Sequence, residues 1–478
     1  MSDNTVIPET TSPATSPAGG RPGSFSLDVE RRTVASAVAS YVGRLRTGDP
    51  GALPAVLGLI VLVVIFSQVS DAFLTRFNIG NLPGQGAYIA VIALGLVFVL
   101  LLGEIDLSAG TAGGMCAAFA ARAVFSGDLH GALPGVLFWA LVVGMAGAIA
   151  LAVWLKAWTG AVVVSVGLVI VLTNLDQHVV LALLAAIAMG AAVGTYTGYL
   201  VAKIGIPSFV VTLALFLAWQ GVILFALSSQ PIGTTKYSLW YGLANSNMSP
   251  ALGWIFTLVV TLGYLGYTLA KSVRARRAGL ASDNLSLVLV RGGIVVAVGV
   301  VLTVLANQNR NTNPYVEIKG IPWAASICII LMIACTIGLT KTSWGRHLYA
   351  TGGNAEAARR AGIDVVHLRM TAFILCSSFG ALGGIFLASS QSSASLDLGS
   401  GNILLFSVAA AVIGGTSLFG GRGRPRDAII GAMVIVIIPN GLLLRPNLGA
   451  QWQQVITGAV LLVAAAVDAL SRRRAARG

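Results

Sequence analysis

The chain has 478 residues, of which 56% are hydrophobic and only 10% are charged, and its mean hydropathy is +0.86. Soluble globular proteins carry roughly 25% charged residues, so this composition argues against a soluble domain and indicates a protein that needs lipid as its solvent. The formal net charge is +13. No basic soluble domain with interleaved aromatic residues accompanies that charge, which argues against nucleic-acid binding and favours cationic loops at a membrane surface.

The N-terminal region predicts a cytoplasmic tail. Its first 30 residues are rich in Ser, Thr, Pro and Gly without an apolar run, which is typical of disorder and unlike a signal peptide. Four arginines then precede the first apolar segment and favour a cytoplasmic N-terminus. We therefore expect a tail over residues 1–50, a transmembrane domain over 51–470 and a basic cytoplasmic tail over 471–478.

Apolar segments follow one another along the transmembrane domain. By the criterion of about 20 apolar residues per span, we expect about 14 of them in an all-α, polytopic helix bundle. An even number returns the C-terminus to the cytoplasm, and most of the 30 Lys and Arg residues then fall on the inner side. The segments centre near residues 61, 95, 117, 145, 167, 190, 217, 260, 296, 331, 379, 411, 436 and 462.

A polar interruption separates the segments near 95 and 117. It holds Glu104, Asp106 and Ser108 between Gly103 and Gly110. Carboxylates at membrane depth cost roughly 2.5–3.5 kcal/mol or more and mark functional positions. Flanking glycines permit unwound backbone, which transporters use where it lines a cavity. The interruption is therefore either such a site or a short cytoplasmic turn with two solvated acids.

The cytoplasmic loop over residues 341–369 encodes a short helix. Asn354 is a good N-cap, and Glu356 sits in the first turn, where the helix dipole favours an acid. Four alanines between Asn354 and Gly362 are strong helix formers, Arg359 and Arg360 suit the C-terminal end, and Gly362 suits a left-handed stop. Such a rigid helix fits a partner that pushes on the membrane domain, whereas a basic loop held at lipid headgroups would explain the charge equally well.

Two further stretches contain recognisable patterns. Pro207 opens the apolar helix near 217 as an N1 residue. Residues 411–424 are glycine-rich, but the Lys-Ser/Thr pair of a phosphate loop does not follow Gly420. We therefore expect no ATP site or other cofactor in this chain, and any ATP and Mg²⁺ would be bound by a separate subunit. The four cysteines show no metal-ligand spacing.

Together these four stretches resemble the sugar permeases of bacterial ABC importers, the ribose and xylose type, which are related to branched-chain amino-acid permeases. Residues 105–110, 207–213, 345–363 and 413–423 carry the likeness, in order along the chain. The greater length and additional apolar segments look most like the xylose type. Glu104 departs from the pattern, because a neutral small residue is expected at its position.

The resemblance implies a permease of the bacterial cytoplasmic membrane that forms a homodimer on two ABC ATPase subunits and receives its substrate from an extracytoplasmic sugar-binding protein. It also implies functional positions. The translocation pathway or gate would use Glu104, Asp106, Ser108 and Gly110. The coupling helix and its loop would use Gly345, Arg346, Gly353, Asn354, Glu356, Ala357, Ala358, Arg359 and Gly362.

Substrate contacts are less defined by the sequence. Trp219, Gln220, Asn307 and Trp323 near the external side could bind sugar hydroxyls or faces, although Trp also anchors helices at membrane interfaces. Overall resemblance favours xylose or a related pentose or hexose. The alternatives are a branched-chain amino-acid or nucleoside ABC permease and an ion-coupled secondary transporter in which Glu104 and Asp106 would carry the ion.

Overall fold

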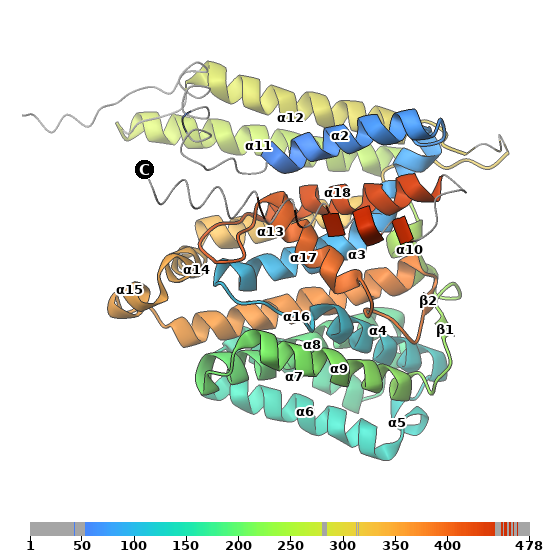
Figure 1. The fold of residues 1–478 in the computed structure, drawn as a ribbon, viewed down its shortest axis with the longest axis vertical. Helices are drawn as coiled ribbons and strands as arrows, with labels where there is room; N and C mark the ends of the chain where they lie inside the picture. Colours follow the sequence, from blue (N-terminus) through green and yellow to red (C-terminus); the bar gives the residue numbers. More distant parts are fainter. Residues whose placement is uncertain are drawn as a thin grey trace, which may run out of the picture. The chain divides into compact units, whose positions relative to one another are not determined.

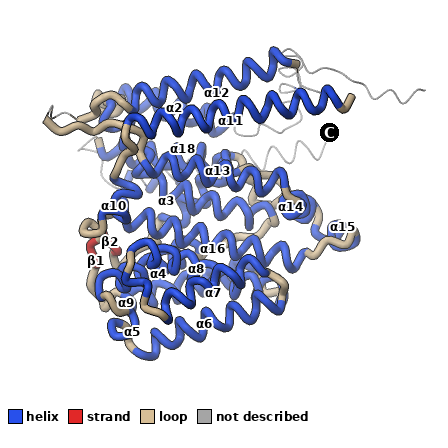
Figure 2. The backbone as a smooth tube through the Cα atoms, turned by 180° about the vertical axis from the view of Figure 1, so that it is seen from behind, coloured by secondary structure: helices blue, strands red, loops and turns tan. Residues whose placement is uncertain are grey.

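The structure is a computed structural model that describes residue 43, residues 53–279, 284–311, 313 and 315–444, and scattered positions between 451 and 466. In this part the chain is almost entirely helical (Figures 1 and 2), which confirms the all-α class. The N-terminal tail, the C-terminal tail and most of the apolar segment expected near residue 462 lie outside the described residues.

The helices are numbered from α2. Their order and bounds, with one 3₁₀ turn (η1), one π turn (η2) and the short antiparallel strands β1 and β2, are as follows: α2 (Leu53–Val69), α3 (Arg76–Leu101), α4 (Ala109–Ser126), α5 (Leu129–Ala132), α6 (Gly135–Trp154), α7 (Trp158–Leu172), η1 (Leu175–Gln177), α8 (Val179–Tyr199), η2 (Leu200–Ile204), α9 (Ser208–Ala226), β1 (Ile232–Gly233), α10 (Ser238–Asn245), α11 (Pro250–Arg277), α12 (Leu285–Ala306), α13 (Trp323–Lys341), α14 (Ser343–Gly353), α15 (Ala355–Arg360), α16 (Val365–Ser390), β2 (Ser393–Ala394), α17 (Ile403–Gly414) and α18 (Pro425–Leu443).

The expected apolar segments from residue 61 to residue 436 coincide with helices, but not all of these helices are full spans. Among the described residues, nine helices are long and apolar enough to cross a membrane. Helices α2, α7 and α17 are apolar but shorter, and α4 is outside both groups. At 12 residues and 1.5 Å per residue, α17 covers roughly 18 Å of a hydrocarbon layer about 30 Å thick. The expected 14 segments and the cytoplasmic termini therefore stay predictions.

The chain divides into two compact units. One comprises Met1–Tyr41 and Val260–Ala297, and the other comprises Val42–Val259 and Val298–Gly478. The described part of the first unit belongs to α11 and α12, where the Leu265 side chain packs over Gly292. Everything described below belongs to the second unit.

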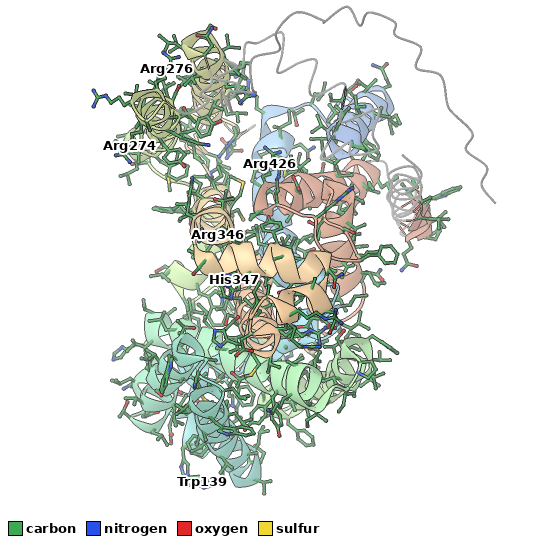
Figure 3. All side chains as sticks on the ribbon, turned by 90° about the vertical axis from the view of Figure 1, so that its left-hand side faces the viewer. Trp139, Arg274, Arg276, Arg346, His347 and Arg426 are labelled. Carbon is green, nitrogen blue, oxygen red and sulfur yellow. The ribbon has the colours of Figure 1, made fainter. Side chains whose placement is uncertain are left out.

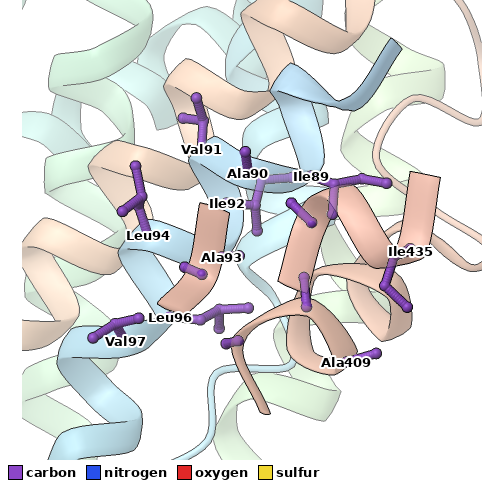
Figure 4. Packing of buried hydrophobic residues seen from close by; sticks show 14 of the residues in the cluster. Ile89, Ala90, Val91, Ile92, Ala93, Leu94, Leu96, Val97, Ala409 and Ile435 are labelled. Carbon is purple, nitrogen blue, oxygen red and sulfur yellow. The ribbon is translucent and has the colours of Figure 1, made fainter. Parts of the chain in front are cut away.

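Helix α16 is central to the second unit, where it packs against α3, α4 and α8. Buried aliphatic residues cover α3 on all sides, and Figure 4 shows how they meet Ala409 of α17 and Ile435 of α18. In α3, 83% of the most apolar stretch is buried, compared with 28% in α6. A helix that is apolar all round and buried is a core helix, so α3 and α16 form the interior and α6 faces the lipid.

Small residues bring the central helices close together. A Cβ atom on Gly113 of α4 would overlap the Gly380 carbonyl of α16, and one on Gly384 of α16 would overlap Gly113 in turn. Glycine at such positions allows helix backbones to approach within a membrane, where dispersion contacts and not hydrophobic burial hold helices together. This close packing fixes the depth at which α4 begins along α16.

Two local predictions need correction. Residues 341–369 were expected to hold one short helix, but an 11-residue helix, α14, precedes α15. Thr342 caps α14 by accepting a hydrogen bond from the Gly345 amide. Pro207 was expected as the first helical residue of α9, but it is the N-cap, with extended backbone at φ −53° and ψ 131°. The chain enters the helix one residue later because proline continues the extended segment before it.

Candidate functional site

Helix α3 stops at Leu101 and α4 starts at Ala109, and the residues between them, 102–108, form a non-helical segment that we call the break. Gly103 adopts φ +76°, a conformation that glycine reaches without strain. The Gly103 and Glu104 amides still donate to the Leu100 and Val99 carbonyls, at 2.9 and 3.0 Å. Two backbone carbonyl groups at the end of α3 thereby have hydrogen-bond partners before the chain turns toward α4.

Asp106 lies fully buried in the break, with an exposed fraction of 0%. Its Oδ1 accepts hydrogen bonds from the Ser108 amide at 2.9 Å and from the Ser108 hydroxyl at 2.7 Å. Its Oδ2 has no hydrogen-bond partner within the described part of the chain, and the Cys376 thiol of α16 lies beside the carboxyl group. Burial excludes a water-exposed turn at Asp106 and favours the alternative of unwound backbone inside the protein.

Glu104 at the other end of the break is paired. Its Oε1 lies 3.2 Å from Nε of Arg369, near the start of α16, and the two side chains are only 14% and 28% exposed. Arg369 is the last residue of the loop over residues 341–369 that the sequence analysis expected on the cytoplasmic side, and that analysis gave it no partner. The structure therefore gives Glu104 a specific contact that its position in the motif did not reveal.

Helix α9 holds the middle of the break through two hydroxyl groups. The Ile105 amide donates to Oγ of Ser208 at 3.3 Å, and Oγ1 of Thr212 lies 3.4 Å from the Ile105 carbonyl. Thr212 also donates to the Ser208 carbonyl at 2.8 Å, within its own helix. The sequence stretch that opens with Pro207 is thus more than a helix start, because its first turn binds the backbone of the polar interruption.

The glycine-rich stretch after α17 meets the end of α3. The Gly421 amide donates to the Leu101 carbonyl at 2.9 Å, and the Tyr349 hydroxyl of α14 donates to the Gly423 carbonyl at 2.7 Å. A Cβ atom on Gly352 would overlap the Leu101 carbonyl, so only glycine lets α14 pack this closely. Four sequence stretches that are far apart in the chain therefore converge on the break, and we call this convergence the junction.

The end of the molecule that carries α14 presents the cytoplasmic stretch expected to couple to a partner (Figure 3, in which Arg346 lies on α14). Asn354 caps α15 by accepting from the Ala357 amide at 2.9 Å, and Gly362 ends this segment at φ +82°. Both features agree with the sequence-based expectation. Glu356 is exposed and pairs with Arg359 at 3.0 Å and Arg360 at 3.2 Å.

The remaining residues expected for coupling have distinct surroundings. Gly345 is buried, and a Cβ atom there would overlap the Leu339 backbone. Ala358 is 5% exposed and turns inward, whereas Gly353 and Ala357 are exposed. In the break, Ser108 is fully buried, and Gly110 of α4 packs against the Gly399 carbonyl.

The candidate substrate contacts do not form one cluster. Trp219 and Gln220 lie on α9 and Trp323 opens α13, and Figures 1 and 2 place α9 and α13 on opposite sides of α16. Nε1 of Trp219 and both amide atoms of Asn307 are buried without a hydrogen-bond partner in the described part of the chain. Trp323 is 37% exposed. The adjacent pair on α9 therefore does not share one site with Trp323.

The loop after α12 is fixed to the start of α3 by a buried arginine. Arg310 is 6% exposed, its Nη2 donates to the Gly320 carbonyl at 3.0 Å, and a Cβ atom on Gly80 would overlap its side chain. Burial lowers the pKa of the Arg310 guanidinium from its ordinary value. The start of α3 is thus covered by a charged group, a feature that the sequence analysis missed.

Long apolar helices with a polar helix break whose Asp106 and Ser108 are fully buried are typical of a polytopic membrane permease. The chain belongs to the family described as branched-chain amino acid transport system / permease component, whose sequence profile matches residues 157–465. The family consists of permease components, so the chain is a membrane transport subunit and not itself an enzyme.

Individual relatives extend the similarity over nearly the whole chain. The xylose transport system permease protein XylH of Escherichia coli K12 is 28% identical over 421 residues, which cover 88% of this chain and 92% of the relative. XylH of Haemophilus influenzae is 28% identical, covering 87% and 96%. The ribose import permease protein RbsC of E. coli K12 is 26% identical, covering 86% and 92%. No solved structure matches the chain significantly.

These relatives are bacterial transport permeases, and the recognition made from the four motifs is confirmed. Together with the long apolar helices, they identify a multi-pass protein of the bacterial cytoplasmic membrane.

Proposed function

We propose that the chain is the membrane subunit of an ATP-driven importer of a monosaccharide, with xylose as the first candidate. The names of the relatives that cover most of the chain, xylose and ribose permeases, support a monosaccharide. The single structural observation that carries the proposal is the junction, where Arg369 of α16 pairs with Glu104 in the break and α14 packs on the last residue of α3, Leu101.

In this proposal two copies of the chain dock on two ABC ATPase subunits, which bind ATP and Mg²⁺. Both termini face the cytoplasm, lipid surrounds the bundle, and an extracytoplasmic sugar-binding protein delivers the substrate. Closure of the ATPases moves α15, and the movement reaches the break through α14 and α16. The break, with Glu104, Asp106 and Ser108, together with Gly110 in the first turn of α4, then switches the pathway between outward- and inward-facing states.

The substrate contacts in this proposal are the four positions Trp219, Gln220, Asn307 and Trp323. Trp219 and Asn307 have buried polar atoms without a partner in the described chain, and a sugar hydroxyl could satisfy such atoms. Because the four positions are dispersed, they would contact the sugar at successive stages and not together. Most of the specificity would then reside in the binding protein.

A branched-chain amino acid is the second candidate substrate, because the family description names that class. Uptake measured with labelled leucine beside labelled xylose separates the two. Leucine uptake without xylose uptake would reject the sugar.

Docking of the ATPase is tested at Glu356. Its carboxylate is exposed, lies in the first turn of α15 and pairs with two arginines. A lysine there opposes the helix dipole and places three cations within two turns, which costs about 1–2 kcal/mol and weakens docking roughly tenfold. We expect Glu356→Lys to retain correspondingly less ATPase in a pull-down of the co-expressed complex.

The matched control is Glu317→Lys, because Glu317 is similarly exposed and pairs with Lys319, but lies in the loop before α13. It should retain the ATPase like the unchanged chain. Equal retention by both variants would remove α15 from the docking surface.

A further inference from the structure

We propose that the ion pair between Glu104 and Arg369 is the latch that couples movement of the cytoplasmic helices to the break. The inference rests on the proposed function and assigns a positioning role to two residues. Arg369 belongs to the helix that follows α15, and Glu104 belongs to the break itself. The pair is therefore a direct side-chain connection between the segment that a partner would push and the segment that would open.

The cytoplasmic helices are joined firmly to the start of α16. The Ile363 amide donates to the Ala358 carbonyl of α15 at 3.0 Å, and Asp364 caps α16 by accepting from the His367 amide at 2.9 Å. Nε1 of Trp344 in α14 donates to Oγ1 of Thr371 at 2.8 Å. A displacement of α14 or α15 is therefore transmitted to the first two turns of α16, where Arg369 lies.

Helix α16 presents one face to the break. Arg369, Cys376 and Gly380 follow at intervals of seven and four residues, which places them on the same side of a helix over roughly 16 Å. Arg369 pairs with Glu104, Cys376 lies beside Asp106, and Gly380 packs against the backbone of Ala109 at the start of α4. A shift of α16 along its axis acts on the whole break at once.

Of these three contacts, only the ion pair depends on the sign of a charge. Both side chains are mostly shielded from water, so the loss of one partner leaves the other charge poorly compensated. Its low exposure also distinguishes it from the exposed Glu356 pairs, which surface solvation weakens. A charge reversal thus disrupts the latch, whereas exchange of the two charges restores it without altering the glycine packing.

The test uses the purified complex of the full chain with its ATPase and binding protein in liposomes, and it measures sugar uptake and ATP hydrolysis on the same sample. We expect Glu104→Arg and Arg369→Glu each to lower the sugar transported per ATP hydrolysed at least about tenfold, since an unpaired shielded charge is costly. The exchange variant E104R/R369E should recover at least half of the lost ratio. The control is Arg76→Glu, at the exposed start of α3, which should transport normally.

The outcomes separate the latch from the function on which it rests. Normal transport by both single reversals, or an exchange variant that assembles with the ATPase but recovers nothing, would overturn the latch alone. If a charge-reversal variant fails to assemble with the ATPase, the neutral variants Glu104→Gln and Arg369→Gln remove the ion pair without introducing a new charge. Their ratio of sugar transported to ATP hydrolysed then tests the latch in the same way. Absence of ATP-dependent sugar uptake by the unchanged complex would overturn the proposed function and the latch with it.

Discussion

Asp106 shows at the residue scale how a small acid can organise a helix break. Both hydrogen bonds to Ser108 end on one carboxyl oxygen, Oδ1, and the other oxygen stays without a partner in the described chain. An asparagine could keep the first oxygen in place as an acceptor while it removes the ionisable group. The side chain therefore allows its role in shaping the break to be separated from a role in transport.

We expect Asp106→Asn to assemble normally and to lower substrate uptake about tenfold, because charge-assisted hydrogen bonds are weakened by about 1–2 kcal/mol. Radiolabelled uptake and retention of the ATPase should be measured on the same membranes. Asp71→Asn, at an exposed position before α3, serves as the matched control. Undiminished uptake by Asp106→Asn would show that neither the charge nor the second oxygen is used.

Asp176, in η1 between α7 and α8, predicts a pH dependence of stability. It is 2% exposed, and both of its carboxyl oxygens are without a hydrogen-bond partner in the described chain. Burial, with a smaller contribution from the negative charge of Asp128, raises its pKa from 3.8 to about 6. The folded state therefore holds the proton more tightly than the unfolded state, and this group's contribution to stability falls as the pH rises from about 4 to 6.

Asp176→Asn should accordingly melt a few degrees above the unchanged protein at pH 7.5, and the difference should shrink toward pH 4. Thermal denaturation in detergent at both pH values measures this. Asp397→Asn, at an exposed site, should show no such pH-dependent difference. If the melting temperatures of Asp176→Asn and the unchanged protein differed by the same amount at both pH values, the raised pKa of Asp176 would not be the cause.

At the scale of elements, a polar pair joins two core helices that each contain an internal proline, Pro83 in α3 and Pro439 in α18. Asn78 and Asn440 exchange hydrogen bonds of 2.9 and 2.8 Å, and Asn440 also donates to Gln85 at 3.1 Å. Both asparagines are at least nine-tenths buried. The pair therefore fixes the two helices to each other where their own backbone ladders are interrupted.

Because a buried amide without a partner costs about 1–3 kcal/mol, Asn440→Leu should lower the melting temperature clearly. The double variant N78L/N440L should lose less than the sum of the single variants, since it leaves neither amide of the pair unpaired. Melting curves of the four proteins give this comparison. Strictly additive losses would mean that the two amides do not depend on each other.

Local chemistry allowed α15 to be predicted, whereas α14 was missed. Residues close in the sequence decide the N-caps at Asn354 and Asp364 and the left-handed turn at Gly362. The sequence is therefore sufficient to predict where α15 begins and ends. Helix α14 contains three glycines, which lower helix propensity. Gly352 packs closely on the Leu101 carbonyl, which is far away in the sequence, and a single sequence does not reveal such a contact.

The same limit applies to the candidate site. An unwound segment around Asp106 was one of two interpretations that the sequence left open, and it was favoured by acids flanked by glycines, because membrane depth makes such residues costly. The pairing of Glu104 with Arg369 could not be predicted, since the two residues are far apart in the sequence and many other cations were equally eligible. The proposed sugar contacts were chosen by residue type alone, and tertiary packing disperses them.

At the scale of the whole molecule, composition alone indicated a membrane helix bundle, and the helices coincide with the apolar segments. The number of complete spans could not be predicted, because the apolar segments expected near residues 411 and 117 are the helices α17 and α4, and neither is both long and apolar enough to be a candidate span. The break and the short α17 are helix discontinuities of the kind from which many transporters build their binding sites.

The central claim, that this permease uses ATP through a partner to import a monosaccharide, is tested most directly by radiolabelled xylose uptake. The measurement compares cells that express the chain with its ATPase and binding protein, cells that lack the ATPase, and cells treated with an ionophore. We predict uptake that requires the ATPase and survives collapse of the ion gradient. Uptake by the chain without the ATPase, abolished by the ionophore, would contradict the claim and indicate a secondary transporter.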